Sequence, residues 1–346
     1  MKQELQLDFT ELQKTVEELL PKNARVSFAD LVAQLMSGDE GGGKELLTGV
    51  MEWLLQSVTF PMEHAVQLLF LILFAALFSN LSKAFQKNGA SQMGFLCVYL
   101  LMALHIASGF QDSLVIAEEG LKNLCQFVSV LLPTYCVSIA FVTGSITAAG
   151  YYQGTAFLIV VFEYLTTYFL LPLSQIYLLL AFASCMQKEP IFERLLNLIV
   201  GLFSWIRKTL IGIVVAFGAV QGVLCPVIDQ LKKSALIKTA STIPGVGNLI
   251  DGAWETVMGA GVVLKNAVGI GGICILFFIC ILPLCNLGLQ YLSYRVVAAV
   301  TEPVSQDSME QFLFHAGTAQ RLLLQTLFLG MMLFLLLLVV MTRITI

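Results

Sequence analysis

The sequence predicts an all-α, polytopic membrane bundle with about six to eight membrane segments, each of roughly 20 apolar residues. Two observations carry this prediction. Only 12% of the 346 residues are charged while 58% are hydrophobic, and the charges gather in residues 1–57. Beyond that segment, long runs contain no Asp, Glu, Lys or Arg. A soluble helix needs a polar face, so these runs indicate a chain embedded in lipid.

The uncharged runs also decide between the two architectures that cross a bilayer. Backbone groups in lipid must pair within a helix or a closed barrel. Barrel strands are short and alternate apolar with polar residues, whereas these runs are long and uniformly apolar, so we expect helices. The runs are 65–82, 93–110, 123–162, 164–187, 209–228, 266–294 and 322–342.

Composition argues against several functional classes. The net charge of −4 comes from the first segment, and the remainder is close to neutral, so no basic surface for nucleic acid is expected. The 8 cysteines lie in or beside apolar runs, without a CxxC pair or a histidine cluster. They are expected to be packing residues. We therefore predict no metal site, no cofactor and no disulfide framework.

Residues 1–57 are predicted to form a soluble acidic helical N-terminal segment. Leucines recur at helical spacing up to Pro21, and a second short helix is expected over 28–36. The stretch Gly38–Lys44 nearly spells the phosphate-binding pattern GxxxxGK. Glu45 replaces the required Ser or Thr, and no strand precedes it, so a flexible acidic linker is the better interpretation.

The membrane region is predicted to have three parts. Residues 58–122 would form a first helix pair, which ends in a polar loop carrying Asp112, Glu118 and Glu119. Residues 123–230 and 231–346 would be two copies of one repeat. Three short sequence matches recur at an offset of 111 residues. A duplication explains them better than chance matches in an apolar chain. The three matches are Pro133 and Pro244, Ala149-Gly150 and Ala260-Gly261, and Pro172-Leu173 and Pro283-Leu284. The copies would be parallel or inverted according to whether each has an even or odd number of crossings.

The second copy opens with a segment that predicts a re-entrant or interfacial hairpin over Ser241–Glu255. Pro244, Gly245 and Gly247 interrupt any helix, and Asp251 with Glu255 places two carboxylates on one face. Membrane bundles with two halves often carry their working site at broken helices near the repeat interface.

Glu163 is the acidic residue embedded in a long apolar stretch, between Phe162 and Tyr164. A carboxylate at the bilayer centre costs about 2.5–3.5 kcal/mol on insertion scales, so such residues often bind protons or cations. The alternative is a position near the membrane surface, with Tyr164 and Tyr168 marking an aromatic belt. His105 could lie on the same polar face, although a lone histidine in a helix is more often a hydrogen-bonded structural residue.

No catalytic pattern is present. The sequence has no HExxH, no GxSxG and no paired intramembrane aspartates, so we predict no catalytic residues and no enzyme, although groups from distant helices can converge. Gly259-Ala-Gly261 and the nearby Gly269, Gly271 and Gly272 predict close helix packing.

Two blocks carry a family resemblance: Thr242-Ile-Pro-Gly-Val-Gly247, and Gly259-Ala-Gly-Val-Val-Leu-Lys-Asn-Ala-Val-Gly269, which leads to the apolar run ending at Pro283. With the acidic N-terminal segment and the multiple spans, the chain resembles the stage III sporulation protein AE family over essentially its whole length. Members usually begin with a signal sequence, which is not visible here. The motif positions are Pro244, Gly245, Gly247, Gly261, Lys265, Asn266 and Gly269.

The resemblance implies a non-enzymatic component of the mother-cell membrane surrounding the forespore. The family belongs to an assembly that joins the two cells as a secretion-like channel or feeding conduit, with a separate ATPase and ring-forming subunits as partners, and that is needed for spore maturation. The residues leave one alternative open, a stand-alone secondary transporter built from two repeated halves, with Glu163 as its coupling site.

Overall fold

The structure is a computed structural model that describes residues 10–19, 27–37, 63–74, 89–142, 145–186, 192–240, 247–303 and 307–343. Every regular element in these ranges is helical, which confirms the predicted all-α bundle. The main elements are α5 (Gly89–Val142), α6 (Ser145–Leu165), the π-helix η2 (Thr166–Leu170), α7 (Leu171–Cys185), α8 (Glu193–Ala240), α9 (Gly247–Thr301) and α10 (Asp307–Arg343).

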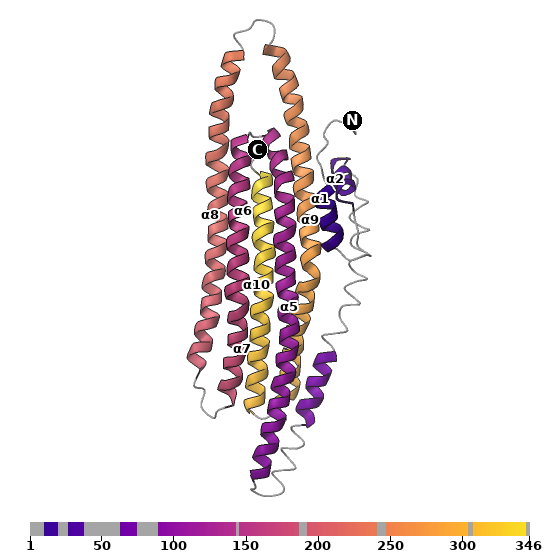
Figure 1. Ribbon diagram of the computed structural model, residues 1–346, viewed down its shortest axis with the longest axis vertical. Coiled ribbons are helices and arrows are strands. Elements are labelled where there is room, and N and C mark those ends of the chain that lie inside the picture. Colours follow the sequence, from indigo (N-terminus) through magenta and orange to yellow (C-terminus); the bar gives the residue numbers. More distant parts are fainter. Residues whose placement is uncertain are drawn as a thin grey trace.

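The long helices run up and down the bundle, side by side (Figure 1). Helices α5, α8 and α9 contain 54, 48 and 55 residues. At 1.5 Å per residue the longest extend about 80 Å, more than twice the roughly 30 Å of a hydrocarbon core. Most helices therefore carry a membrane-spanning stretch and a substantial extension of it.

The predicted loop between residues 110 and 123 is wrong, because α5 passes through it as continuous helix. Asp112, Glu118 and Glu119 lie on the exposed side of that helix, so their charge does not interrupt it. The predicted boundary at 122/123 thus falls inside α5, and the boundary at 230/231 falls inside α8. Residues Trp205–Lys208, which separate two apolar runs of the sequence, are continuous helix within α8.

Helices α6 and α7 follow one another through the π-helical turn η2. Pro172 occupies the start of α7, where it has no N–H to donate. The N–H of Leu171 bonds to the carbonyl of Thr166, and the Thr166 hydroxyl bonds to the carbonyl of Phe162 at 2.8 Å. The wider π-helical turn thereby accommodates Pro172, and the chain stays helical from α6 to α7.

Five stretches in the described part are long and apolar enough to cross a membrane, and helix Glu63–Phe74 is apolar but shorter. This supports a polytopic membrane protein. Within the described part, α5 joins two of the predicted segments, and the predicted segment 65–82 is described only as far as Phe74. The five are Leu96–Ala140, Ser145–Cys185, Glu193–Gln221, Gly261–Thr301 and Asp307–Thr342.

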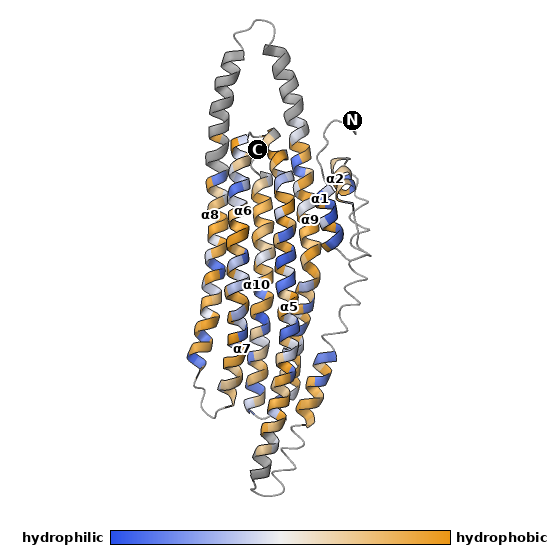
Figure 2. Cartoon of the chain, in the orientation of Figure 1, coloured by the Kyte–Doolittle hydropathy of each residue, from blue (hydrophilic) through white to orange (hydrophobic). Residues whose placement is uncertain are grey.

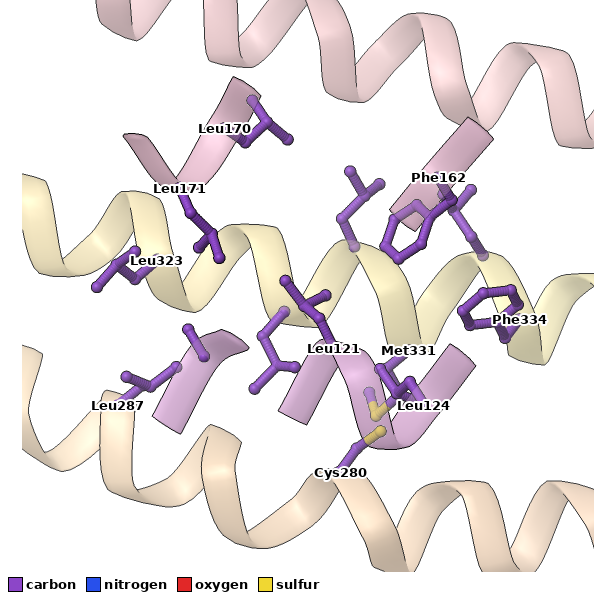
Figure 3. Close-up of a cluster of buried hydrophobic side chains, with 14 of the residues drawn as sticks. Leu121, Leu124, Phe162, Leu170, Leu171, Cys280, Leu287, Leu323, Met331 and Phe334 are labelled. Atoms are coloured by element: carbon purple, nitrogen blue, oxygen red, sulfur yellow. The ribbon is translucent and has the colours of Figure 1, made fainter. Parts of the chain in front are cut away.

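The core lies where α10 meets α5, α6 and α9 (Figure 3). The Phe162 and Phe334 rings pack edge to face with centroids 5.3 Å apart. Gly330 of α10 sits so close that a Cβ there would lie 2.8 Å from Phe162 and 3.2 Å from Leu121. Side chains from every neighbouring helix thus interdigitate around α10.

The N-terminal segment has both predicted helices, α1 (Thr10–Leu19) and α2 (Phe28–Ser37). They are joined by the Gln13 side chain, whose Oε1 accepts a 2.7 Å hydrogen bond from the Phe28 N–H. Leu12, Val16 and Val32 are buried in the same apolar core as the bundle. The segment is therefore docked on the bundle, with α1 against α5 and α2 against α9.

The helix order bears on the predicted duplication, which stays a prediction. The predicted first copy, 123–230, contains the end of α5, α6–α7 and most of α8, and the second, 231–346, contains the end of α8, α9 and α10. At the offset of 111 residues α6–α7 corresponds to α9 and α8 to α10, and corresponding helices run in the same direction (Figure 1). Of the predicted hairpin, residues 241–246 lie outside the described ranges, and from Gly247 onward the chain is the first part of α9.

Candidate functional site

Three of the predicted motif residues lie in a line along α9. Gly261, Lys265 and Gly269 follow one another at intervals of four and are all buried, whereas Asn266 points away and is exposed. Residues spaced by four share one helix face. The structure therefore brings Gly261, Lys265 and Gly269 together on the packed face and leaves Asn266 on the surface.

Lys265 is completely buried, and its Nζ donates a 2.9 Å hydrogen bond to the backbone carbonyl of Thr342. Thr342 lies in the last turn of α10, where carbonyls have no partner within the helix. A cation there also meets the negative end of the helix dipole. Lys265 thus ties the end of α10 to the side of α9.

Next to Lys265, three glycines form what we call the glycine seam: Gly269, Gly271 and Gly272. A Cβ at Gly269 would overlap Thr342 of α10 and lie 3.0 Å from the Tyr135 hydroxyl of α5. At the other two glycines a Cβ would approach Leu31 of α2 and Leu131 of α5. The motif residues therefore hold four helices together.

Glu163 lies apart from this seam. It is exposed on α6, next to the exposed rings of Tyr164 and Tyr168, whose centroids are 5.2 Å apart. Its neighbour Phe162 packs at the level of Leu124 of α5. Tyr135, which contacts the glycine seam, lies eleven residues further along α5. An exposed carboxylate beside two tyrosines is typical of a membrane surface. A coupling role for Glu163 stays a prediction.

The remaining predicted positions are outside what the structure describes. Pro244 and Gly245 fall in residues 241–246. Gly247, Asp251 and Glu255 belong to the first turns of α9, but their side chains are not among the described ones.

Sequence reasoning missed a polar row on α5, which we call the α5 stripe. Its members are all exposed and lie on one face of the helix, where the exposed Val115 separates Asp112 from Glu118. The helical spacing of these polar residues is visible in the sequence. It predicts a polar helix face only if residues 110–123 are read as helix rather than as a loop. The α5 stripe comprises Ser108, Gln111, Asp112, Glu118, Glu119, Lys122, Gln126 and Ser129.

The α5 stripe runs beside the apolar core. Leu121 and Leu124 on the opposite side of the same turns are buried among the residues in Figure 3. Hydrophilic residues lie between hydrophobic ones along α5, as they also do on neighbouring helices of the bundle (Figure 2). Since each charged side chain in lipid costs several kcal/mol, this face of α5 is suited to water or to another protein surface.

A second group that sequence reasoning missed is a polar cluster between α5, α9 and helix Glu63–Phe74. A Cβ at Gly109 would lie 3.2 Å from Gln290 Nε2, 3.2 Å from the Tyr294 hydroxyl and 3.3 Å from His64 Nδ1. Gln290 Nε2 donates to the Tyr294 hydroxyl at 3.3 Å, while its Oε1 is buried without a partner. The ring of His105 lies 5.0 Å from that of His64. Gly109 thus makes room for converging polar groups.

Among the described residues, no group of three or more His, Cys, Asp or Glu side chains lies close enough to hold a metal ion. Cys125, Cys136, Cys185 and Cys280 are free and buried in the apolar core. They occupy packing positions, as predicted from the sequence.

Comparisons with known proteins bear out the resemblance. No solved structure matches the chain. A curated relative, stage III sporulation protein AE of Bacillus subtilis (strain 168), is 25% identical over 288 residues, covering 83% of this chain and 71% of the relative. The family model described as stage III sporulation protein AE matches residues 26–345, which include the glycine seam, Lys265 and the α5 stripe. The chain therefore belongs to the stage III sporulation protein AE family.

Proposed function

We propose that this chain is a non-enzymatic membrane subunit of a channel between the mother cell and the forespore. It would reside in the mother-cell membrane that surrounds the forespore. Its partners would be other stage III sporulation proteins, including a separate ATPase and ring-forming subunits. Family membership and the five apolar spans support the cellular setting, and the α5 stripe carries the conduit role.

The α5 stripe supports a conduit for a physical reason. Glu118, Glu119 and Lys122 are exposed on a helix that is apolar enough to span the membrane. Leu124 packs at the level of Phe162, so these charges lie near the level of Tyr164 and Tyr168, at the membrane surface, where they can face water or another protein. When several copies or partners turn this face toward a common axis, the stripe lines a polar path beside the bilayer.

The described side chains favour a passive role over catalysis. The buried polar groups are far apart along α9. Lys265 bonds to the end of α10, whereas Gln290 and Tyr294 lie 25 or more residues further along α9. The Tyr177 hydroxyl of α7 lies 2.9 Å from Nδ1 of His315 of α10, and we assign this pair a structural role between the two helices. Energy for transport would come from the ATPase partner.

Deletion of the gene in the source organism tests the proposal. We expect development to arrest after the forespore is engulfed, and heat-resistant spores to be lost, because late forespore gene expression would lack its conduit. Counting heat-resistant spores and staging cells by microscopy measures this. The intact gene supplied in trans should restore spores. Normal spore numbers in the deletion strain would contradict the proposal.

A stand-alone secondary transporter is the second candidate, and the polar cluster at Gly109 favours it, because such clusters mark substrate or proton paths in membrane bundles. In that case Glu163→Gln should abolish solute uptake by the purified protein in liposomes, since the amide cannot carry the coupling charge. Unchanged sporulation and transport in Glu163→Gln would dismiss a coupling role. Uptake without any partner protein would favour the transporter over the channel subunit.

A further inference from the structure

A cavity of about 280 Å³ lies between α6, α8 and α10, and every side chain lining it is apolar. It reaches the outer surface of the bundle, because the lining residues Phe157 and Ile213 are both exposed. The deeper wall is formed by buried residues such as Phe162, Val214 and Leu337. An apolar crevice of this kind accepts a hydrocarbon chain rather than a polar solute.

The position of the cavity relative to the membrane surface follows from the aromatic residues near it. Tyr164, Tyr168 and Trp205 are 67%, 70% and 64% exposed, and exposed Tyr and Trp rings gather at membrane surfaces. Helices α6 and α8 run antiparallel, with Phe217 packed against Gly154. Counting ten residues along each helix from that contact places Tyr164 and Arg207 at about the same height. The cavity begins just beyond this level, where lipid chains begin.

Arg207 lies one turn of α8 before Leu210, beyond the end of the cavity that is nearer to Tyr164 and Trp205. It precedes Leu210 by three residues and Val214 by seven, so all three share one face of α8. Arg207 is half-buried, and the described residues offer it no ion pair. Lys208 is exposed and points about 100° away around the helix.

The acidic neighbour does not cancel this charge. Glu163 is the acidic residue of α6 at the same height, but the cavity is lined by Leu158, Val161 and Phe162. Helical geometry places Glu163 about 150° from the middle of those three residues. On α6 and α8, Arg207 is thus the charged group nearest to this end of the cavity on the cavity-lining face.

We propose that this cavity binds an acyl chain of an anionic phospholipid whose phosphate pairs with Arg207. The apolar walls take the chain, and the guanidinium forms charge-assisted hydrogen bonds with the phosphate. Basic residues at the mouths of crevices between membrane helices are suited to anionic headgroups. The assignment is independent of the channel role.

The test uses the full-length protein purified in detergent and mixed with dioleoyl-phosphatidylglycerol or dioleoyl-phosphatidylcholine, with bound lipid counted by native mass spectrometry. We expect phosphatidylglycerol to be retained about fivefold more strongly, the contribution of one basic residue near a membrane surface. Equal retention of the two lipids by the unmodified protein would show that the cavity holds bulk lipid and would overturn the proposal.

Two matched pairs of variants locate the site. Arg207→Gln should remove the preference for phosphatidylglycerol, whereas Lys208→Gln, which loses the same charge on the neighbouring residue, should keep it. Val214→Phe fills the cavity and should reduce retention of both lipids, whereas Val215→Phe on the exposed face should not. Equal losses within either pair would overturn the assignment. If Arg207→Gln fails to fold, the Val214 and Val215 variants still test whether lipid occupies the cavity.

One further arm separates a lipid headgroup from free phosphate. Glycerol 3-phosphate carries the same phosphate chemistry without acyl chains, and it should not displace phosphatidylglycerol when added in excess. Complete displacement would show that Arg207 binds a soluble phosphate and that the cavity takes no part. That result would contradict the proposal as surely as equal retention.

Discussion

Gly269→Val is expected to destabilise the bundle by about 3 kcal/mol, at the upper end of the usual cost of overpacking a core. A Cβ at this position already overlaps Thr342 and lies 3.0 Å from the Tyr135 hydroxyl, and valine adds two more carbons. Tyr135 is fully buried and cannot move aside without disturbing its neighbours. Displacing Thr342 would also pull its carbonyl away from Lys265.

The matched control is Gly259→Val in the same helix. A Cβ at Gly259 meets nothing within 4 Å, and the residue is exposed. Surface substitutions of this kind change stability by about 0.5 kcal/mol or less. The two variants therefore make the same chemical change in α9 and differ in packing.

Unfolding of the purified variants by sodium dodecyl sulfate in mixed micelles measures the difference. If the midpoints of Gly269→Val and Gly259→Val shift equally, the glycine seam is not a close helix contact. An unchanged midpoint for Gly269→Val would contradict the packing of α9 against α10. A large loss at Gly269 alone supports the account of the motif as a helix junction.

The apolar runs sufficed to predict the helical membrane class, since no soluble fold accommodates them. The charged interval between residues 110 and 123, which predicted a loop, is helix in the structure. Glu118 and Glu119 can remain in a helix when the opposite side of that helix, around Leu121 and Leu124, packs into a core. Local sequence reports the charge but not what lies across the helix.

The candidate sites were predictable to different degrees. Gly269 and its neighbouring glycines indicated close packing, and the structure supplies the partners. The role of Lys265 depends on Thr342, which lies 77 residues away in the sequence. The cluster around Gly109 combines side chains from three helices. Contacts of this kind arise from tertiary structure, so no local pattern encodes them.

Replacing both carboxylates of the α5 stripe with leucine, Glu118→Leu with Glu119→Leu, is expected to reduce heat-resistant spores to the level of the deletion strain. The leucines would desolvate a face that must stay hydrated, while the buried side of α5 is untouched. The paired variant Glu118→Gln with Glu119→Gln keeps the polarity and should retain part of the function. Glu193→Leu, at the exposed first turn of α8, is the control for surface hydrophobicity.

If the α5 stripe faces lipid instead of water or protein, the double leucine variant should behave in the opposite way. If Glu118 and Glu119 pointed into lipid, their removal would relieve roughly 2.5 kcal/mol or more for each carboxylate at the bilayer centre. The double leucine variant would then be several kcal/mol more stable in mixed micelles and would sporulate normally. Loss of spores with normal protein accumulation and no such gain places the stripe against water or a partner. Normal spores with a stabilised protein would place it in the bilayer and remove the observation on which the conduit role depends.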